Sequence, residues 1–177
     1  MTLRPWREED APAVAEICQD PEIPRWTNVP SPYSEEDART FIRETLAGDR
    51  AELARVIVDA ESGELLGAVG LRLPAPGVGE VGYWLGSHAR GRGAATRAVR
   101  LMCRWAFDEF SLARMQLHTL PGNTASERVA ERAGFTREGL LRSFTEMKGK
   151  RTDIVMFSLL PGELGGTRVD LCPPEGE

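Results

Sequence analysis

The sequence has few cysteines, almost no lysine and no long apolar run. Its 177 residues include three cysteines, Cys18, Cys103 and Cys172, which are far apart and odd in number. Such spacing fits neither a disulfide framework nor a metal-ligand cluster, so we predict no metal site and a reducing, cytoplasmic setting. Cys18 and Cys103 fall in helical patterns, where a thiol packs as a small core residue.

No apolar stretch approaches the roughly 20 residues that a membrane span needs. The amino-terminal "MTLRPWREED" has no apolar signal segment, so we expect neither membrane insertion nor secretion. The formal net charge of -5 disfavours a general nucleic-acid-binding surface. We predict one domain over residues 1–161, followed by a flexible tail rich in glycine and proline over residues 162–177.

Hydrophobic periodicity predicts seven strands and four helices. The predicted strands cover residues 2–6, 51–59, 64–73, 79–86, 114–120, 135–142 and 153–160, and the predicted helices cover 8–20, 34–48, 93–110 and 124–134. Residues 21–33 contain four prolines and are expected to be irregular, and the polar residues 143–152 are expected to form a loop. The alternation of strands and helices in the second half predicts an α/β fold with a parallel strand pair there.

Two helix starts carry capping signals. Ser34 with Asp37, and Thr124 with Glu127, have the spacing of a capping box, in which each side chain bonds the other residue's backbone amide.

The stretch "HARGRGAATRAV" gathers glycine and arginine where the helix over 93–110 begins. A helix start has about four unpaired backbone N–H groups and a partial positive charge, both of which attract phosphate. Gly91 and Gly93 would allow a close backbone approach, and Arg90 and Arg92 would add forked hydrogen bonds. The alternative is an ordinary glycine loop with incidental arginines, because all but two of the 22 basic residues are arginine.

Two nucleotide-binding patterns do not fit this turn. The P-loop pattern G-x-x-x-x-G-K-[ST] does not occur in the chain. The dinucleotide fingerprint G-x-G-x-x-G would need glycine at Thr96, and an acidic residue at the end of the next strand, "RMQLHTL", which has none. A nucleotide-binding protein is therefore disfavoured.

The turn resembles the acetyl-CoA pyrophosphate motif of the GNAT superfamily of N-acetyltransferases, [RQ]-x-x-G-x-[GA], at Arg90, Gly93 and Ala95. "GEVGYWLG" precedes it and "PGNTASERVAERAGF" follows it, as in the RimJ/RimL-like branch of ribosomal-protein alanine acetyltransferases. "LRPWREEDAPAV" near the start and "DIVMFSLL" near the end also match, so the resemblance spans about residues 2–161.

The resemblance implies a mixed, mostly antiparallel seven-stranded sheet in three α+β layers, flanked by about four helices, with a splayed central parallel pair. It implies direct transfer of an acetyl group from acetyl-CoA to a primary amine, without a metal, and the possibility of a homodimer. The pantetheine arm would pair with the first splayed strand, where a backbone amide would stabilise the thioester oxyanion. The implied cofactor-binding residues are Trp84, Leu85, Arg90, Gly91, Arg92, Gly93, Ala94, Ala95, Thr96, Asn123 and Ser126.

The resemblance also suggests catalytic residues. Ser126 shares a helix face with Val129 and Ala133, so its hydroxyl points inward and needs a partner. Many family members have a tyrosine proton donor four residues later, where this chain has Ala130; in the branch a serine at the position of Ser126 takes over. The alternative for Ser126 is a small helix residue that bonds its own backbone. For Asn123, the alternative to contacting the pantetheine arm is a role as a helix N-cap.

Two glutamates are candidates for the general base. Glu80 alternates with Trp84 on one strand face, where many family members place a base that acts through water; a solvated strand residue is the alternative. The glutamate used by RimL-like enzymes aligns with Thr145, so Glu146 beside it is the second candidate.

The acceptor is predicted to be an α-amine at a peptide or protein N-terminus. At pH 7, deprotonating an α-amine of pKa ~8 costs about 1.4 kcal/mol, against about 4.6 kcal/mol for a lysine of pKa ~10.4. Trp26, Tyr33 and residues 143–152 would line the acceptor side, although Trp26 would also suit a core position. A small amine acceptor (an antibiotic, polyamine or amino acid) and a non-catalytic acyl-CoA-binding module are the alternatives.

Overall fold

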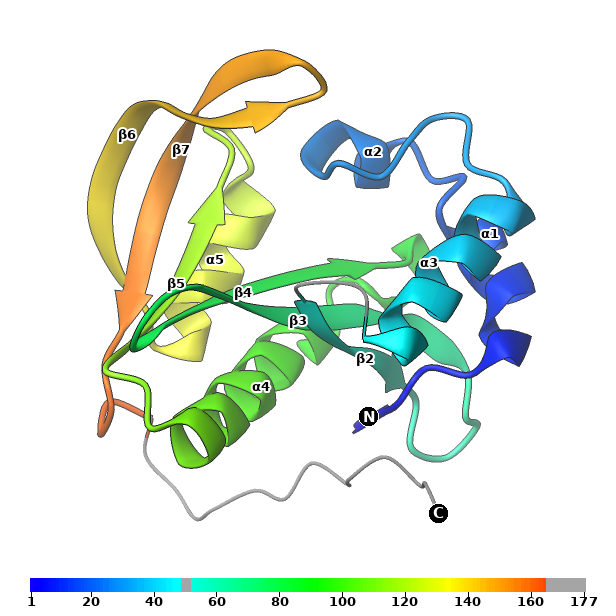
Figure 1. Cartoon of the computed structure of the whole chain (residues 1–177), viewed down its shortest axis with the longest axis horizontal. Coiled ribbons are helices and arrows are strands. Elements are labelled where there is room, and N and C mark those ends of the chain that lie inside the picture. The colour runs from blue at the N-terminus through cyan, green and yellow to red at the C-terminus, as the bar shows by residue number, and fades with distance from the viewer. Residues whose placement is uncertain (49–51, 165–177) are drawn as a thin grey trace.

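The computed structural model describes residues 1–48 and 52–164 and contains a seven-stranded sheet in the order β1-β2-β3-β4-β5-β7-β6 (Figure 1). The strands are β1 (Thr2–Arg4), β2 (Glu52–Val58), β3 (Leu65–Ala75), β4 (Val78–Leu85), β5 (Arg114–Thr119), β6 (Thr136–Met147) and β7 (Lys150–Leu159). The helices are α1 (Ala11–Ile17), α2 (Glu22–Trp26), α3 (Glu35–Ala47), α4 (Ala94–Phe110) and α5 (Thr124–Ala133), with 3-10 turns η1 (Glu8–Asp10) and η2 (Ser87–Ala89). In this described part of the chain, no helix is long and apolar enough to cross a membrane.

The sheet is antiparallel except at its centre, where β4 and β5 run parallel. These two strands pair over only three positions, from Val78↔Arg114 to Glu80↔Gln116. Beyond that point β4 continues to Leu85 and β5 to Thr119 without pairing to each other. This divergence confirms the predicted splayed pair, and it leaves a gap in the middle of the sheet.

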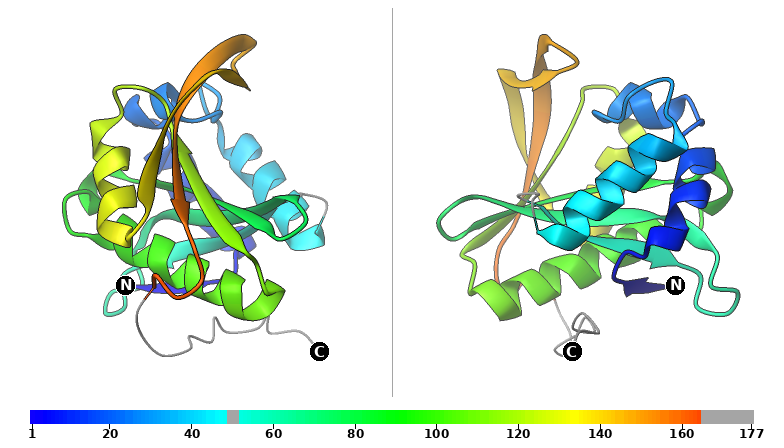
Figure 2. Two further views of the ribbon diagram at one scale, coloured as in Figure 1. Left: turned by 90° about the vertical axis from the view of Figure 1, so that its left-hand side faces the viewer. Right: turned by 45° about the vertical axis from the view of Figure 1, so that its right-hand side comes forward.

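The two faces of the sheet carry different helices. Helices α4 and α5 cover one face, and α1 and α3 cover the other (Figures 1 and 2). Side chains of β4 alternate between them: Val81 and Leu85 join the α4–α5 core, whereas Trp84 packs against the α1–α3 core. Every residue of the splayed strands can therefore be assigned to one of two opposite faces.

Two predicted loops contain regular structure. The proline-rich segment 21–33 includes α2, in which Pro24 is the third residue. The first residues of a helix have no intrahelical acceptor for their N–H groups, so a proline there removes no helical hydrogen bond. The prediction that the whole segment is irregular was therefore wrong.

Residues 143–152 form a hairpin rather than a loop, because β6 and β7 extend to Met147 and Lys150. The hairpin turns at Lys148 (φ 51°) and Gly149 (φ 74°), and two successive positive φ values suit a two-residue type I′ turn. We call residues 140–154 the β6–β7 arm. It projects from the sheet toward α2 (Figure 1), where Lys148 Nζ donates a hydrogen bond to the Pro24 carbonyl oxygen.

One of the two predicted capping boxes is present. Ser34 Oγ accepts from the Asp37 amide at 3.1 Å, and Asp37 accepts from the Ser34 amide at 2.8 Å. At α5 the N-cap is Asn123, whose Oδ1 accepts from the Ser126 amide at 3.1 Å, and Thr124 is the first helical residue. The predicted Thr124 box was therefore wrong by one residue.

The predicted tail over 162–177 is described only as far as residue 164, so the rest of it, with Cys172, lies outside the described residues. Cys18 and Cys103 are buried free thiols, as predicted.

Candidate active site

A cavity of about 1100 Å³ extends over the gap between β4 and β5. Its walls come from α2 and α3 on one side, the start of α4 and α5 on another, and the β6–β7 arm. Its floor includes the ends of both splayed strands, where β4 and β5 no longer pair with each other, with Trp84 and Leu85 from β4 and Thr119 from β5. The volume suits a large organic cofactor together with a second small group.

The glycine-rich turn lies at one end of this cavity. Gly91 (φ 77°) and Gly93 (φ 73°) both have left-handed backbone conformations, and Gly93 is the N-cap of α4. No side chain caps this helix start. The cavity is lined here by Gly91, Gly93, Ala94, Ala95 and Thr96. An uncapped helix start that faces a cavity is an anion-binding arrangement, because its first amides and its dipole both point at the ligand.

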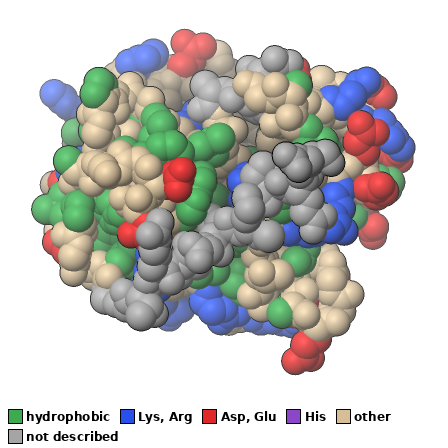
Figure 3. Space-filling view, turned by 60° about the horizontal axis from the view of Figure 1, so that its bottom comes forward, with side chains coloured by type: hydrophobic (Ala, Val, Ile, Leu, Met, Phe, Trp, Pro, Cys, Tyr) green, Lys and Arg blue, Asp and Glu red, His purple; other side chains and the backbone are tan. Residues whose placement is uncertain are grey.

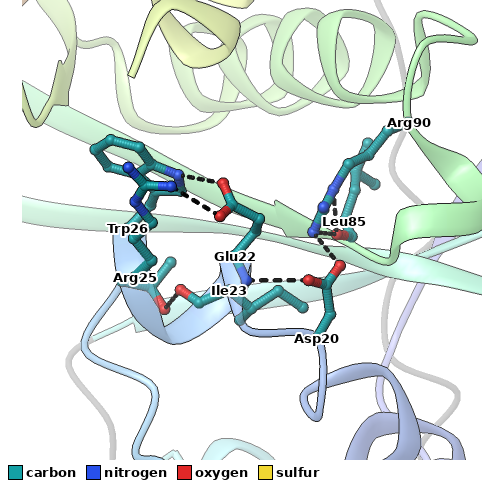
Figure 4. Close-up of polar contacts among 8 residues, drawn as sticks. Asp20, Glu22, Ile23, Arg25, Trp26, Leu85 and Arg90 are labelled. Carbon is teal, nitrogen blue, oxygen red and sulfur yellow. Dashed lines mark hydrogen bonds and ion pairs between the residues drawn. The ribbon is translucent and has the colours of Figure 1, made fainter. Parts of the chain in front are cut away.

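The two arginines of the turn lie differently. Arg90 lines the cavity, but its guanidinium donates to the Leu85 carbonyl oxygen at 2.9 and 3.2 Å and pairs with Asp20 at 2.8 Å (Figure 4). Arg90 thus ties the end of β4 to the α1–α2 connection. Arg92 is exposed and is not part of the cavity lining. The backbone of the turn, more than its arginines, therefore faces the cavity.

Basic side chains also occur elsewhere on the molecule. Figure 3 shows Lys and Arg side chains at several separate places on the α4 side of the molecule. This agrees with the frequent use of arginine throughout the chain.

Trp26 and Tyr33, the residues predicted to lie on the acceptor side, both line the cavity. Trp26 Nε1 donates to Glu22 at 2.9 Å, and the Arg25 guanidinium lies 4.7 Å from the centre of the indole ring (Figure 4). The hydrogen bonds from Trp26 and Arg25 lower the pKa of Glu22. The indole is therefore held at the cavity wall by polar contacts and is not a fully buried core anchor.

Ser126 faces a tyrosine that the sequence analysis did not select. Tyr83 Oη of β4 donates a hydrogen bond to Ser126 Oγ of α5 at 3.0 Å, and both residues line the cavity. Burial raises the pKa of Tyr83 to about 12, although the contact with Ser126 acts in the opposite direction. The alternation of β4, which places Tyr83 on the same face as Val81 and Leu85, was the available signal.

Glu80 is the centre of a polar cluster at the point where the strands separate. Its carboxylate pairs with Arg72 of β3 at 2.7 Å and accepts from Gln116 Nε2 of β5 at 3.1 Å. The same carboxylate lies 3.3 Å from His118 Nδ1 of β5. Burial favours a higher pKa for Glu80, but His118, Arg72 and Gln116 outweigh it and lower the pKa. Glu80 is thus a half-buried, paired carboxylate and not a solvated strand residue.

Comparison with known proteins identifies the family of this chain. The sequence profile of the acetyltransferase (GNAT) domain matches residues 1–136. The chain belongs to the GNAT family of acetyltransferases.

The acetyltransferase is 31% identical to N-acetyltransferase p20 of Bacillus licheniformis over 172 residues, which cover 94% of this chain and 96% of that protein. It is 24% identical over 127 residues to the ribosomal-protein-serine acetyltransferase of Escherichia coli, with 71% of each chain covered. Its structure is similar to that of Mycobacterium smegmatis RimJ in complex with CoA-disulfide, with a TM-score of 0.78, 25% identity and coverage of 93% and 84%. These findings confirm the predicted family, enzyme class and fold.

The polar groups of this acetyltransferase lie on both faces of the splayed strands. Tyr83 and Ser126 lie on the α4–α5 face. Glu80 and His118 lie on the opposite face, as their alternation with the core residues Val81 and Leu117 requires. A group that enters the gap between the strands therefore meets hydroxyls on one side and a carboxylate–imidazole pair on the other.

Glu146 and Asn123 also line the cavity. Glu146 is exposed on the β6–β7 arm, opposite Arg151 in the hairpin register. Glu80 is much more enclosed, with its side chain only 12% exposed. Asn123 combines its N-cap role with a place in the cavity wall, so both roles considered from the sequence are compatible.

Proposed function

We propose that this acetyltransferase moves the acetyl group of acetyl-CoA to the α-amino group of a peptide or protein N-terminus. The observation that carries the proposal is the cavity at the β4–β5 gap, with an uncapped helix start at one end and two hydroxyls beside the gap. The CoA-disulfide complex of the related RimJ and the name of the Escherichia coli relative support the same assignment.

The cofactor would follow the cavity from the start of α4 to the gap. The amides of Gly93, Ala94 and Ala95 would bind its pyrophosphate, since they lie at the uncapped start of α4 and line the cavity. The pantetheine arm would lie along β4 near Trp84 and Leu85, where β5 no longer pairs with it. A β4 amide at this point would stabilise the oxyanion that forms on the thioester oxygen.

The chemistry is a direct attack of the amine nitrogen on the thioester carbon. A C–N bond forms, the C–S bond breaks, and the electron pair of that bond leaves on sulfur. Ser126 would give its hydroxyl proton to the thiolate. Because Tyr83 donates to Ser126 Oγ, the hydrogen of Ser126 is free to point at the sulfur.

The acceptor is assigned as an amine that loses its proton readily near neutral pH. An α-amine has a reference pKa of about 8, roughly 2.4 pH units below that of lysine. The wall formed by Trp26, Tyr33 and the β6–β7 arm has the mixed apolar and polar character suited to the first residues of a peptide. RimL, a structural neighbour of this chain, is an α-N-protein acetyltransferase of ribosomal L7/L12, and this supports the same kind of acceptor.

The proposal is tested in two steps. In the first, the unfolding temperature is measured with acetyl-CoA, free CoA and NAD. A ligand at a hundred times its Kd adds about 2.7 kcal/mol, or several degrees, and only the two CoA species should do so. In the second, free-thiol release is measured with a peptide that has a free N-terminus and with its matched N-blocked, lysine-containing counterpart.

Faster thiol release with the free N-terminus is the expected result. A preference for the lysine side chain would overturn the acceptor assignment. Binding of acetyl-CoA with no transfer to any amine would instead favour a non-catalytic CoA-binding module.

A further inference from the structure

We propose that His118 accepts the proton of the acceptor amine and that Glu80 holds His118 in the orientation this requires. The inference rests on the proposed amine-acetyltransferase activity and adds a residue to it. Neither candidate base found from the sequence, Glu80 or Glu146, needs to take the proton directly.

His118 lies where the two strands have just separated. It is two residues beyond Gln116, the last residue of β5 that pairs with β4, and it lines the cavity. Its side chain is 24% exposed, whereas its Nδ1 atom is fully buried. The buried ring edge therefore faces the protein at Glu80, and the Nε2 edge is the one left to face the cavity.

Glu80 is held in place as a partner for Nδ1. Arg72 binds one carboxylate oxygen at 2.7 Å, and Gln116 donates to the other at 3.1 Å, the oxygen that is 3.3 Å from His118 Nδ1. The lowered pKa of Glu80 keeps this carboxylate ionised at neutral pH. At this distance Nδ1 makes no well-aligned hydrogen bond to the carboxylate. An ionised carboxylate so close can only accept, so it favours the imidazole tautomer with hydrogen on Nδ1 and a free lone pair on Nε2.

The cavity that His118 lines also contains charged side chains from several elements, namely Glu36, Asp37 and Glu44 of α3, Glu52 of β2, Arg90, and Arg128 and Arg132 of α5. Arg72 comes from β3 and Glu80 from β4, while β7 places the neutral Met156 opposite His118 in register. Glu22 of α2 and Glu146 of the β6–β7 arm line the same cavity.

An imidazole is better suited than Glu80 to take a proton from an amine. A carboxylate with a pKa below 4.5 is more than 3 pH units below an α-amine, so it accepts the ammonium proton only rarely. Imidazole is the side chain that enzymes use most often as a general base. The carboxylate of Glu80 thus orients the imidazole of His118, and the imidazole accepts the proton of the amine.

The proton balance closes with the groups present. The acceptor enters as an ammonium ion and gives one proton to Nε2 of His118, directly or through one water. The neutral nitrogen attacks the thioester carbon, and the C–N bond forms as the C–S bond breaks. The nitrogen then loses a second proton, the sulfur gains one from Ser126 Oγ, and that hydroxyl is reprotonated with the proton lost by nitrogen. One proton leaves His118 for solvent in each turnover.

The test compares His118→Gln and Glu80→Gln with His88→Gln, which changes the other histidine of the chain. His88 is partly exposed, bonds the Leu65 carbonyl oxygen, and is not part of the cavity lining, so its variant controls for loss of imidazole in general. Free-thiol release is measured from pH 6 to pH 9 with one peptide acceptor, and the Kd of acetyl-CoA is measured by calorimetry.

We expect kcat/KM of His118→Gln to fall by about 100-fold or more at pH 7, the usual contribution of a general base. The deficit should shrink as the pH approaches the pKa of the amine, because more of the acceptor is then already neutral. Glu80→Gln should lose less, about tenfold, and His88→Gln should match the wild type. The Kd of acetyl-CoA should stay the same in all three, and imidazole in the buffer should partly restore a His118→Gly variant.

Three results would overturn the assignment. Wild-type activity in His118→Gln together with a large loss in Glu80→Gln would make Glu80 the base. A deficit of His118→Gln that is independent of pH, or a weakened Kd for acetyl-CoA, would give His118 a structural role only. Each of these leaves the proposed function intact, whereas absence of transfer by the wild-type protein would refute the proposed function itself.

Discussion

The contact between Tyr83 and Ser126 allows a quantitative test of the proton donor. Ser126→Ala removes the hydroxyl that would protonate the thiolate, and a general acid typically contributes 100-fold or more to the rate. We therefore expect a fall in kcat of about 100-fold with little change in the Kd of acetyl-CoA. Tyr83→Phe removes only the 3.0 Å hydrogen bond to Ser126 Oγ. A neutral hydrogen bond has a net value of about 1 kcal/mol, which corresponds to a fall in kcat of about fivefold.

The double variant separates a shared role from two independent ones. If Tyr83 acts through Ser126, then Tyr83→Phe has nothing left to orient in the Ser126→Ala background, and kcat should not fall further. The coupling energy of the cycle should accordingly be about 1 kcal/mol, well above the few tenths expected of independent sites.

The assay is free-thiol release at saturating acetyl-CoA, with circular dichroism to confirm folding of each variant. Additive losses would refute the coupling between the two hydroxyls. An unchanged kcat in Ser126→Ala would refute the donor role itself, and the serine would then be a small helix residue on an inward face.

Three further predictions concern the sheet. A Cβ at Gly67 would overlap the Trp84 carbonyl oxygen, so Gly67→Ala should push β3 away from β4. The unfolding temperature should fall by several degrees and acetyl-CoA should bind more weakly. Unchanged acetyl-CoA binding by calorimetry would contradict this. A Cβ at Gly82 would meet nothing within 4 Å, so Gly82→Ala should keep the unfolding temperature but raise the KM of the acceptor several-fold, and an unaltered KM would show that the acceptor does not approach there. The Arg114 contact lowers the pKa of Glu138 to about 2, so this exposed pair stabilises the fold above about pH 4.5 and loses that effect as the pH falls toward 2. Glu138→Gln should lower the free energy of unfolding by about 0.5 kcal/mol at pH 7 and leave it unchanged at pH 2. If chemical denaturation shows the same difference between variant and wild type at both pH values, the ion pair is not the cause.

Local signals in the sequence were sufficient for most of the fold. The period-2 and period-3.6 patterns predicted all seven strands and the helices α1, α3, α4 and α5, because apolar spacing depends only on which face of an element is buried. The patterns failed at α2 and at the β6–β7 arm. Pro24 was taken as a helix breaker although it lies in a first turn, and the arm is too exposed to show apolar alternation.

The cavity residues divide in the same way. Ser126, Asn123 and the turn from Gly91 to Thr96 were selected because they lie in or next to a recognisable motif. Tyr83 and His118 were not, although Tyr83 lies in the stretch "GEVGYWLG", because each acquires its chemistry from a partner 43 or 38 positions away in the chain.

The sequence by itself determined the order of the elements, the family and the place of the glycine turn, because these depend on neighbours along the chain. The tertiary structure decided which groups share the β4–β5 gap. Only the registers of β3, β4 and β5 bring Arg72, Glu80 and Gln116 into one row, with His118 two residues beyond it. A hydrogen bond or ion pair forms only within about 3 to 4 Å, and distances on that scale between separate strands are set by packing, not by spacing along the chain.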